Sequence, residues 1–311
     1  MIDDLNPIRY SNTTFNAKVF KPKATIQNYG RIATQTGHNG TNHPSEIMLY
    51  FYLDSIAEND TISITMLNDQ GDTVNIHSNF PQENQNQIKP KSGSNLVLLK
   101  YNYKAAKSFE DMILWWSSLN GPIAYPGEYQ LIFKAKSYSE TVKANIAKDP
   151  RYPVSDLDVK KQFDFIKSIR DKLDESNKCI IQMRDIKQQI SSLLSRTDKS
   201  TQTDTLWTLK KQIDSTMNSI ETELYQTKNK SGQDPINFPI KLTNKLAHLT
   251  ALFQNDSYPP TDQAEAYRKE ISELIDIQLN RFAKLKESEI SNFNQVLHQL
   301  KVDLIKPNKI N

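Results

Sequence analysis

The spacing of hydrophobic residues changes near residue 150, and this change most restricts the folds open to the chain. Before it, apolar and polar residues alternate in short runs such as residues 61–66, which predicts half-buried β-strands. After it, apolar residues recur at helical spacing, and Ile166, Leu173 and Ile180 repeat every seven residues, as in a helical seam. The sequence therefore predicts a β part followed by an α part.

The β part is expected to span residues 23–148, after a leading segment at residues 1–22. A turn at residues 68–72 joins two of its strands into a hairpin. The predicted strands are residues 46–53, 61–66, 73–76, 96–103, 125–133 (a turn leading into a strand) and 141–146. Because no helical pattern separates these short strands, we expect an antiparallel β-sandwich of immunoglobulin or fibronectin type.

The α part is expected to span residues 155–306, after a junction at residues 149–154. Ser155 followed by Asp158 predicts a capped start of the first helix, and Thr261 is expected to cap the last one. These two helices are expected to have roughly 40 residues each, or about 60 Å. Because the connections are short, we expect an antiparallel three- to four-helix bundle.

Composition restricts the function classes further. Hydrophobic residues make up 37% and charged residues 24%, which is typical of a soluble globular protein, and no apolar run approaches the length of a membrane span. The net charge is +3, and no basic cluster is interleaved with aromatic residues, so no nucleic-acid partner is expected. The first residues are acidic, unlike a signal peptide. The lone Cys179 rules out an internal disulfide and is interpreted as a small buried residue.

Motifs of catalysis and cofactor binding are absent from the sequence. Neither phosphate-binding glycine pattern occurs, nor does the nucleophile elbow of hydrolases, so no cofactor is expected. His38 and His43 share a loop rich in Gly and Asn but have no partner at zinc-site spacing, so we expect no metal. Glu110 and Asp111 are adjacent, and on a strand they would face opposite ways rather than flank a glycosidic bond. We therefore predict no catalytic residue.

Aromatic and charged residues near the junction are candidates for an interface. Trp115 and Trp116 are suited to stacking on sugar rings, since an aromatic face is apolar. The alternative, which we favour, is that they form core and, together with Tyr125, a contact between the two parts. Arg151 is expected to pair with a carboxylate such as Asp149.

The stretch at residues 224–242 is polar, with one Gly and two Pro, although helical patterns flank it. Gly232 is expected in a left-handed turn, and Asp234 before Pro235 begins a turn. We interpret the stretch as an ordered structural loop whose side chains satisfy helix ends, with a partner-docking surface as the alternative. Its candidate residues are Tyr225, Asn229, Asp234 and Asn237.

Several short stretches point to a known family. They are residues 3–9 (DDLNPIR), 19–22 (VFKP), 112–115 (MILW), 121–124 (GPIA), 126–129 (PGEY), 149–151 (DPR), 225–229 (YQTKN), 234–239 (DPINFP) and 245–246 (KL). Together they resemble the C-terminal region of bacterial sortilin-like, glycoside-hydrolase-like proteins, in which a β-propeller of BNR (Asp-box) repeats precedes an immunoglobulin-like domain and a helical tail. The resemblance spans nearly the whole chain, departs from the family pattern at residues 95–103 and lacks the propeller.

The resemblance implies a secreted or periplasmic parent protein. It also implies a non-catalytic accessory module, which supports the upstream β-propeller of the same parent chain or docks a protein or glycan partner. Two alternatives stay open: a fragment or subunit of a glycoside hydrolase, and a carbohydrate-binding module that uses its tryptophans.

Overall fold

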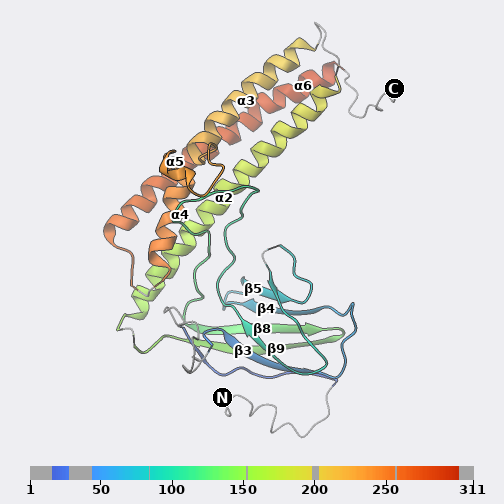
Figure 1. Cartoon of the computed structure of the whole chain (residues 1–311), viewed down its shortest axis with the longest axis vertical. Coiled ribbons are helices and arrows are strands. Elements are labelled where there is room, and N and C mark those ends of the chain that lie inside the picture. Colours follow the sequence, from blue (N-terminus) through green and yellow to red (C-terminus); the bar gives the residue numbers. More distant parts are fainter. Residues whose placement is uncertain are drawn as a thin grey trace. The chain divides into compact units, whose positions relative to one another are not determined.

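The computed structural model describes residues 16–27, 44–83, 85–151, 153–197, 203–255 and 258–300. These residues show β-structure before residue 150 and helices after it, which confirms the predicted β plus α class (Figure 1). They divide into two compact units. The first comprises residues within 1–105, 120–167 and 253–260, and the second comprises residues within 106–119, 168–252 and 261–311. The 106–119 segment, which precedes strand β8 in sequence, thus belongs to the second unit.

The strands of the first unit form two sheets. The smaller sheet has the order β1 (Ala17–Val19), β3 (Ile47–Leu53), β7 (Gly93–Leu99) and is antiparallel. The larger sheet has the order β2 (Thr25–Ile26), β9 (Tyr138–Ala147), β8 (Gly127–Ala135), β4 (Ile62–Leu67), β5 (Thr73–Ser78), β6 (Asn86–Gln87). Its outer strands β2 and β6 run parallel to their neighbours, so the prediction of a wholly antiparallel arrangement is wrong at these edges. Both strands have only two residues, which is too few for an alternating pattern to show in the sequence.

Strands of both sheets contribute side chains to a shared hydrophobic core among the described residues. Alternate residues of β3, including Ile47, Leu49 and Phe51, are fully buried, because successive side chains of a strand point to opposite faces. The Phe51 ring of the smaller sheet lies 5.0 Å from the Phe133 ring of the larger sheet, centroid to centroid. The hairpin turn predicted at residues 68–72 is confirmed, with the Asn68 N–H donating to the Asp72 carbonyl at 3.0 Å.

The first and last predicted helices begin at the expected positions, directly after Ser155 and Thr261. The helical elements are α2 (Asp156–Ser195), α3 (Asp204–Leu224), the short 3₁₀ helix η2 (Asp234–Ile236), α4 (Leu242–Phe253), α5 (Asp262–Leu285), the π-helical turn η3 (Lys286–Ile290) and α6 (Ser291–Gln299). The Ser155 hydroxyl accepts a hydrogen bond from the Asp158 N–H at 3.1 Å, and Thr261 accepts one from the Ala264 N–H at 3.2 Å. Both predicted N-caps are thereby confirmed.

The heptad positions predicted on the first helix are buried in α2. Leu173 and Ile180 are fully buried, and Ser176, the polar residue in this series, is buried as well. None of the described helices is long and apolar enough to cross a membrane. Cys179 is buried, as expected for a small core residue, and burial raises the pKa of its thiol to about 12.

Candidate functional site

The 106–119 segment is the most unusual part of the second unit. Within this segment, neither strand nor helix forms among the residues that the structure describes. Asp111 has φ 59° and Trp116 has φ 46°, both in the left-handed region. An L-residue pays roughly 1–2 kcal/mol for that conformation. Such strain persists where the surroundings hold the backbone in place, and the contacts of this segment show how it is held.

The start of the segment is anchored on α2. The Lys107 N–H donates to an Asp174 carboxylate oxygen at 2.8 Å, and the Lys107 carbonyl accepts from the Asn177 amide at 2.6 Å. Burial opposes ionisation of Asp174, but hydrogen bonds from Lys178 and from the Lys107 N–H outweigh it and lower the pKa of Asp174. This carboxylate is therefore charged at neutral pH when it accepts from the segment.

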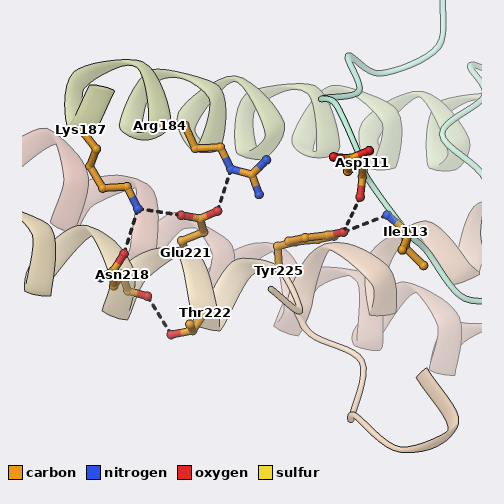
Figure 2. Close-up of polar contacts among 8 residues, drawn as sticks. All are labelled: Asp111, Ile113, Arg184, Lys187, Asn218, Glu221, Thr222 and Tyr225. Carbon is orange, nitrogen blue, oxygen red and sulfur yellow. Dashed lines mark hydrogen bonds and ion pairs between the residues drawn. The ribbon is translucent and has the colours of Figure 1, made fainter. Parts of the chain in front are cut away.

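Tyr225, the residue that follows α3, anchors the middle of the segment. Its buried hydroxyl accepts from the Ile113 N–H at 2.8 Å and donates to the Asp111 carbonyl at 3.4 Å (Figure 2). Its ring meets the Phe109 ring edge-on, with centroids 5.0 Å apart. One side chain thus satisfies two backbone groups next to the strained Asp111.

A charged cluster continues from this anchor along α2 and α3. The Glu221 side chain is only 7% exposed, and it binds the Arg184 Nε at 2.8 Å and the Lys187 ammonium at 3.2 Å (Figure 2). The Arg184 guanidinium carbon lies 4.4 Å from the centre of the Phe109 ring, a cation–π contact. Arg184 therefore connects the buried carboxylate to the 106–119 segment.

The end of the segment is held by α4. The Asn244 side chain accepts from the Trp115 N–H at 2.6 Å and donates to the Trp115 carbonyl at 2.8 Å, so one buried amide pairs both backbone groups of Trp115. The His248 Nδ1 lies 2.6 Å from the Trp116 carbonyl. Because a carbonyl only accepts, this contact places a proton on Nδ1.

These contacts leave the Trp116 side chain facing solvent. It is 73% exposed, and its ring lies 6.2 Å from the ring of Trp115, which is half-buried. His248, which binds the Trp116 backbone, and the exposed Leu252 lie one turn apart on the same face of α4. We call Trp116, His248 and Leu252 the Trp116 surface.

The loop after α3 is organised around Asp234. One Asp234 carboxylate oxygen accepts from the backbone N–H groups of Lys230 and Ser231 at 2.6 and 2.9 Å. These two bonds lower the pKa of Asp234. The Asn237 N–H donates to the Asp234 carbonyl at 2.8 Å, and the Asn229 N–H to the Gln226 carbonyl at 3.5 Å. The loop is thus hydrogen-bonded within itself.

The prediction of a left-handed Gly232 is wrong. Among the glycines that the structure describes, positive φ occurs at Gly71 and Gly93. Two hydrogen bonds between residues three positions apart close the turns around Gly232. The Asp234 N–H donates to the Ser231 carbonyl, and the Ile236 N–H donates to the Gln233 carbonyl. The Asp234 side chain supplies the bonds that a left-handed glycine turn would otherwise provide.

Replacing Asp234 with Ala is expected to lower the melting temperature, because three hydrogen bonds to its carboxylate are lost. Asn237→Ala is the matched control, since its side chain is exposed and its backbone bond to Asp234 survives. Differential scanning calorimetry measures both. Equal melting temperatures for the two variants would contradict the structural role of Asp234.

Two other candidate residues lie in the first unit. The Arg151 side chain donates to both carboxylate oxygens of the buried Asp149, at 2.9 and 3.0 Å from Nε, which confirms the expected pair. These hydrogen bonds hold the pKa of Asp149 below its usual value. The Tyr125 hydroxyl donates to the Asp156 carbonyl at 3.2 Å. The structure therefore gathers Trp115, Trp116 and Tyr225 in one unit and Tyr125 and Arg151 in the other.

Sequence reasoning missed Phe109, Arg184, Glu221 and Asn244. A signal existed for one of them, since Glu221 follows the apolar Met217 by four positions and so shares its helix face. A polar residue on an apolar stripe of a helix predicts a buried partner. No comparable signal marks Phe109, Arg184 or Asn244.

No group of three or more His, Cys, Asp or Glu side chains among the described residues is placed to hold a metal, and His38 and His43 lie outside those residues. Asp111, expected on a strand beside Glu110, instead lies in a turn. No protein-family model, no curated protein and no solved structure matches this chain.

Proposed function

We propose that the chain is an accessory docking module that binds a protein partner through the Trp116 surface. In this proposal its parts are an immunoglobulin-like β-sandwich and a three- to four-helix bundle, and it is the C-terminal region of a sortilin-like BNR protein. The partner is the β-propeller of the same parent chain. The observation that carries the proposal is an exposed tryptophan held in a strained backbone by α4.

A fixed, exposed tryptophan is suited to protein docking. Tryptophan buries about 150–250 Å² when covered and is enriched among the residues that dominate interface energies. The backbone around Trp116 is already ordered by Asn244 and His248, so less conformational entropy is lost on binding. His248 and Leu252 add a polar and an apolar neighbour, as in the centre of many interfaces.

The first test is the reading frame upstream of Met1, which is expected to encode Asp-box repeats and, at its start, a signal peptide for a secreted or periplasmic parent. The propeller that it encodes would then be titrated with this chain by calorimetry. Trp116→Ala is expected to weaken binding at least about 10-fold, the loss typical of an interface hot spot.

Ile236→Ala is the matched control for this titration. Ile236 is 69% exposed and lies in the same unit, but it is outside the Trp116 surface. Its replacement is expected to leave the dissociation constant unchanged. Equal affinities of the Trp116 and Ile236 variants would refute docking at Trp116, and an upstream frame without a propeller would refute the choice of partner.

A further inference from the structure

A cavity of about 240 Å³ lies within the first unit, and no residue of the Trp116 surface lines it. The described residues that line it carry no charge. Its polar lining is made of amide side chains, which both donate and accept hydrogen bonds. They are Gln27, Asn102, Asn120, Gln162, Gln254 and Asn255. A lining of this kind fits a neutral ligand with hydroxyl groups, whereas a phosphate or carboxylate needs a cationic partner.

Gln27 shows that the cavity offers a hydrogen-bond acceptor. The residue is 1% exposed, and its amide nitrogen donates to the Ala124 carbonyl at 3.0 Å. That bond fixes the orientation of the amide. The side-chain oxygen has no hydrogen-bond partner among the described residues. Buried acceptors are nearly always paired, and Gln27 lines the cavity, so we assign this unpaired oxygen as the acceptor for a donor in the cavity.

The wall beside Gln27 is rigid. The Tyr103 N–H donates to the Pro122 carbonyl, and the Ala124 N–H donates to the Tyr101 carbonyl, both at 2.9 Å. Gly121 lets these two chains approach closely, because a Cβ there would lie 2.5 Å from the Tyr103 carbonyl oxygen. Gln27 therefore lines a cavity whose wall is ordered before a ligand arrives.

Aromatic rings complete the lining. Tyr125 and Phe163 both border the cavity, with ring centroids 6.4 Å apart and planes at 64°. The Tyr103 ring also packs edge-on against Phe163, with the ring centroids 5.3 Å apart, which supports the position of Phe163. An aromatic face covers the apolar C–H side of a sugar ring, while amides pair with its hydroxyls.

From these features we infer that the cavity binds one ring of a neutral sugar, with a ligand hydroxyl donating to the Gln27 side-chain oxygen. The volume lies just below the roughly 300–1,000 Å³ typical of sites for drug-sized ligands, which suits a single ring. The inference does not depend on docking at Trp116, because the two sites share no residue.

The test is an NMR titration of the full chain with glucose, galactose, mannose and N-acetylglucosamine at millimolar concentrations. At least one of them is expected to shift the backbone signals of Gln27 and Ile123 in a saturable way. Glucuronate and glucosamine, which are charged, are expected to shift none. Val159→Phe, which adds a ring at the buried wall of the cavity, is expected to abolish the shifts even where the added volume lowers the melting temperature.

Two further variants keep the result clear. Gln27→Leu is expected to weaken sugar binding at least about 10-fold, because the site then loses the acceptor for the ligand hydroxyl. Gln130→Leu, an exposed amide on β8, is expected to change nothing. Asn120→Ala on the rim replaces Val159→Phe if that variant does not fold.

Binding of acetyl-glutamine amide in place of every sugar would overturn the inference in favour of a peptide site. Shifts from no compound would overturn it in favour of a site for water.

Discussion

Replacing Arg184 and Lys187 together with methionine is expected to lower the free energy of unfolding of the second unit by about 3–5 kcal/mol. Both cations bind the Glu221 carboxylate, whose side chain is 7% exposed. Without them a buried negative charge has no compensating partner. All three tryptophans lie in the second unit, so their fluorescence during guanidinium denaturation reports on this unit alone.

The triple variant that adds Glu221→Leu is expected to recover most of the loss, because no buried charge is left. Arg268→Met is the control, since it removes a more exposed pair with Glu265 on α5 and costs at most about 1 kcal/mol. If the double and triple variants unfold at the same denaturant concentration, the buried charge is not the cause of the loss.

Lowering the pH from about 6.5 to 4 is expected to destabilise the first unit by about 3 kcal/mol through His77. His77 is buried on β5, and its Nε2 accepts from the Lys100 N–H at 3.0 Å. Burial, and then the charge of Lys100, lower the pKa of His77 to about 4. Between pH 6.5 and 4, His77 is therefore protonated in the unfolded chain but neutral in the folded chain. The stability present above pH 6.5 is lost as the pH falls towards 4.

His77→Gln is expected to flatten this dependence, because a glutamine oxygen also accepts from the Lys100 N–H but does not titrate. His298→Gln, at an exposed position on α6, is the control. Most of the tyrosines lie in the first unit, which contains no tryptophan, so the tyrosine part of the near-ultraviolet circular dichroism mainly follows its unfolding. Asp149, with its lowered pKa, begins to lose its own contribution at the acidic end of this window, and most of that loss comes below it. Parallel pH profiles of the wild type and His77→Gln would rule out His77 as the titrating group.

Local patterns in the sequence predicted the long elements well. The alternation at residues 61–66 became β4, and the seam of Leu173 and Ile180 became the buried face of α2. Both patterns repeat over several residues, so the pattern of α2 can still be recognised although the polar Ser176 occupies one of its apolar positions. The strands β1, β2 and β6 have only two or three residues, too few for a period to show.

The candidate site was less predictable because its contacts join distant parts of the chain. Trp115 meets Asn244, which lies 129 residues later, and no spacing rule connects two such positions. The loop around Asp234 shows a local limit as well. Its composition predicted a turn correctly, but either a left-handed glycine or a carboxylate cap can close that turn, and the bonds of Asp234 decided the outcome.

The order of synthesis gives the 106–119 segment a particular folding problem. Its anchors follow it by 67 residues at Asp174 and by 132 residues at His248. At about 5–20 residues per second, a ribosome delivers these partners roughly 3–26 seconds after the segment itself. During that interval the apolar run from Met112 to Trp116 lacks Tyr225, Asn244 and His248, which hold it in the folded chain. Chaperones that bind exposed hydrophobic segments therefore have a defined target in the nascent chain.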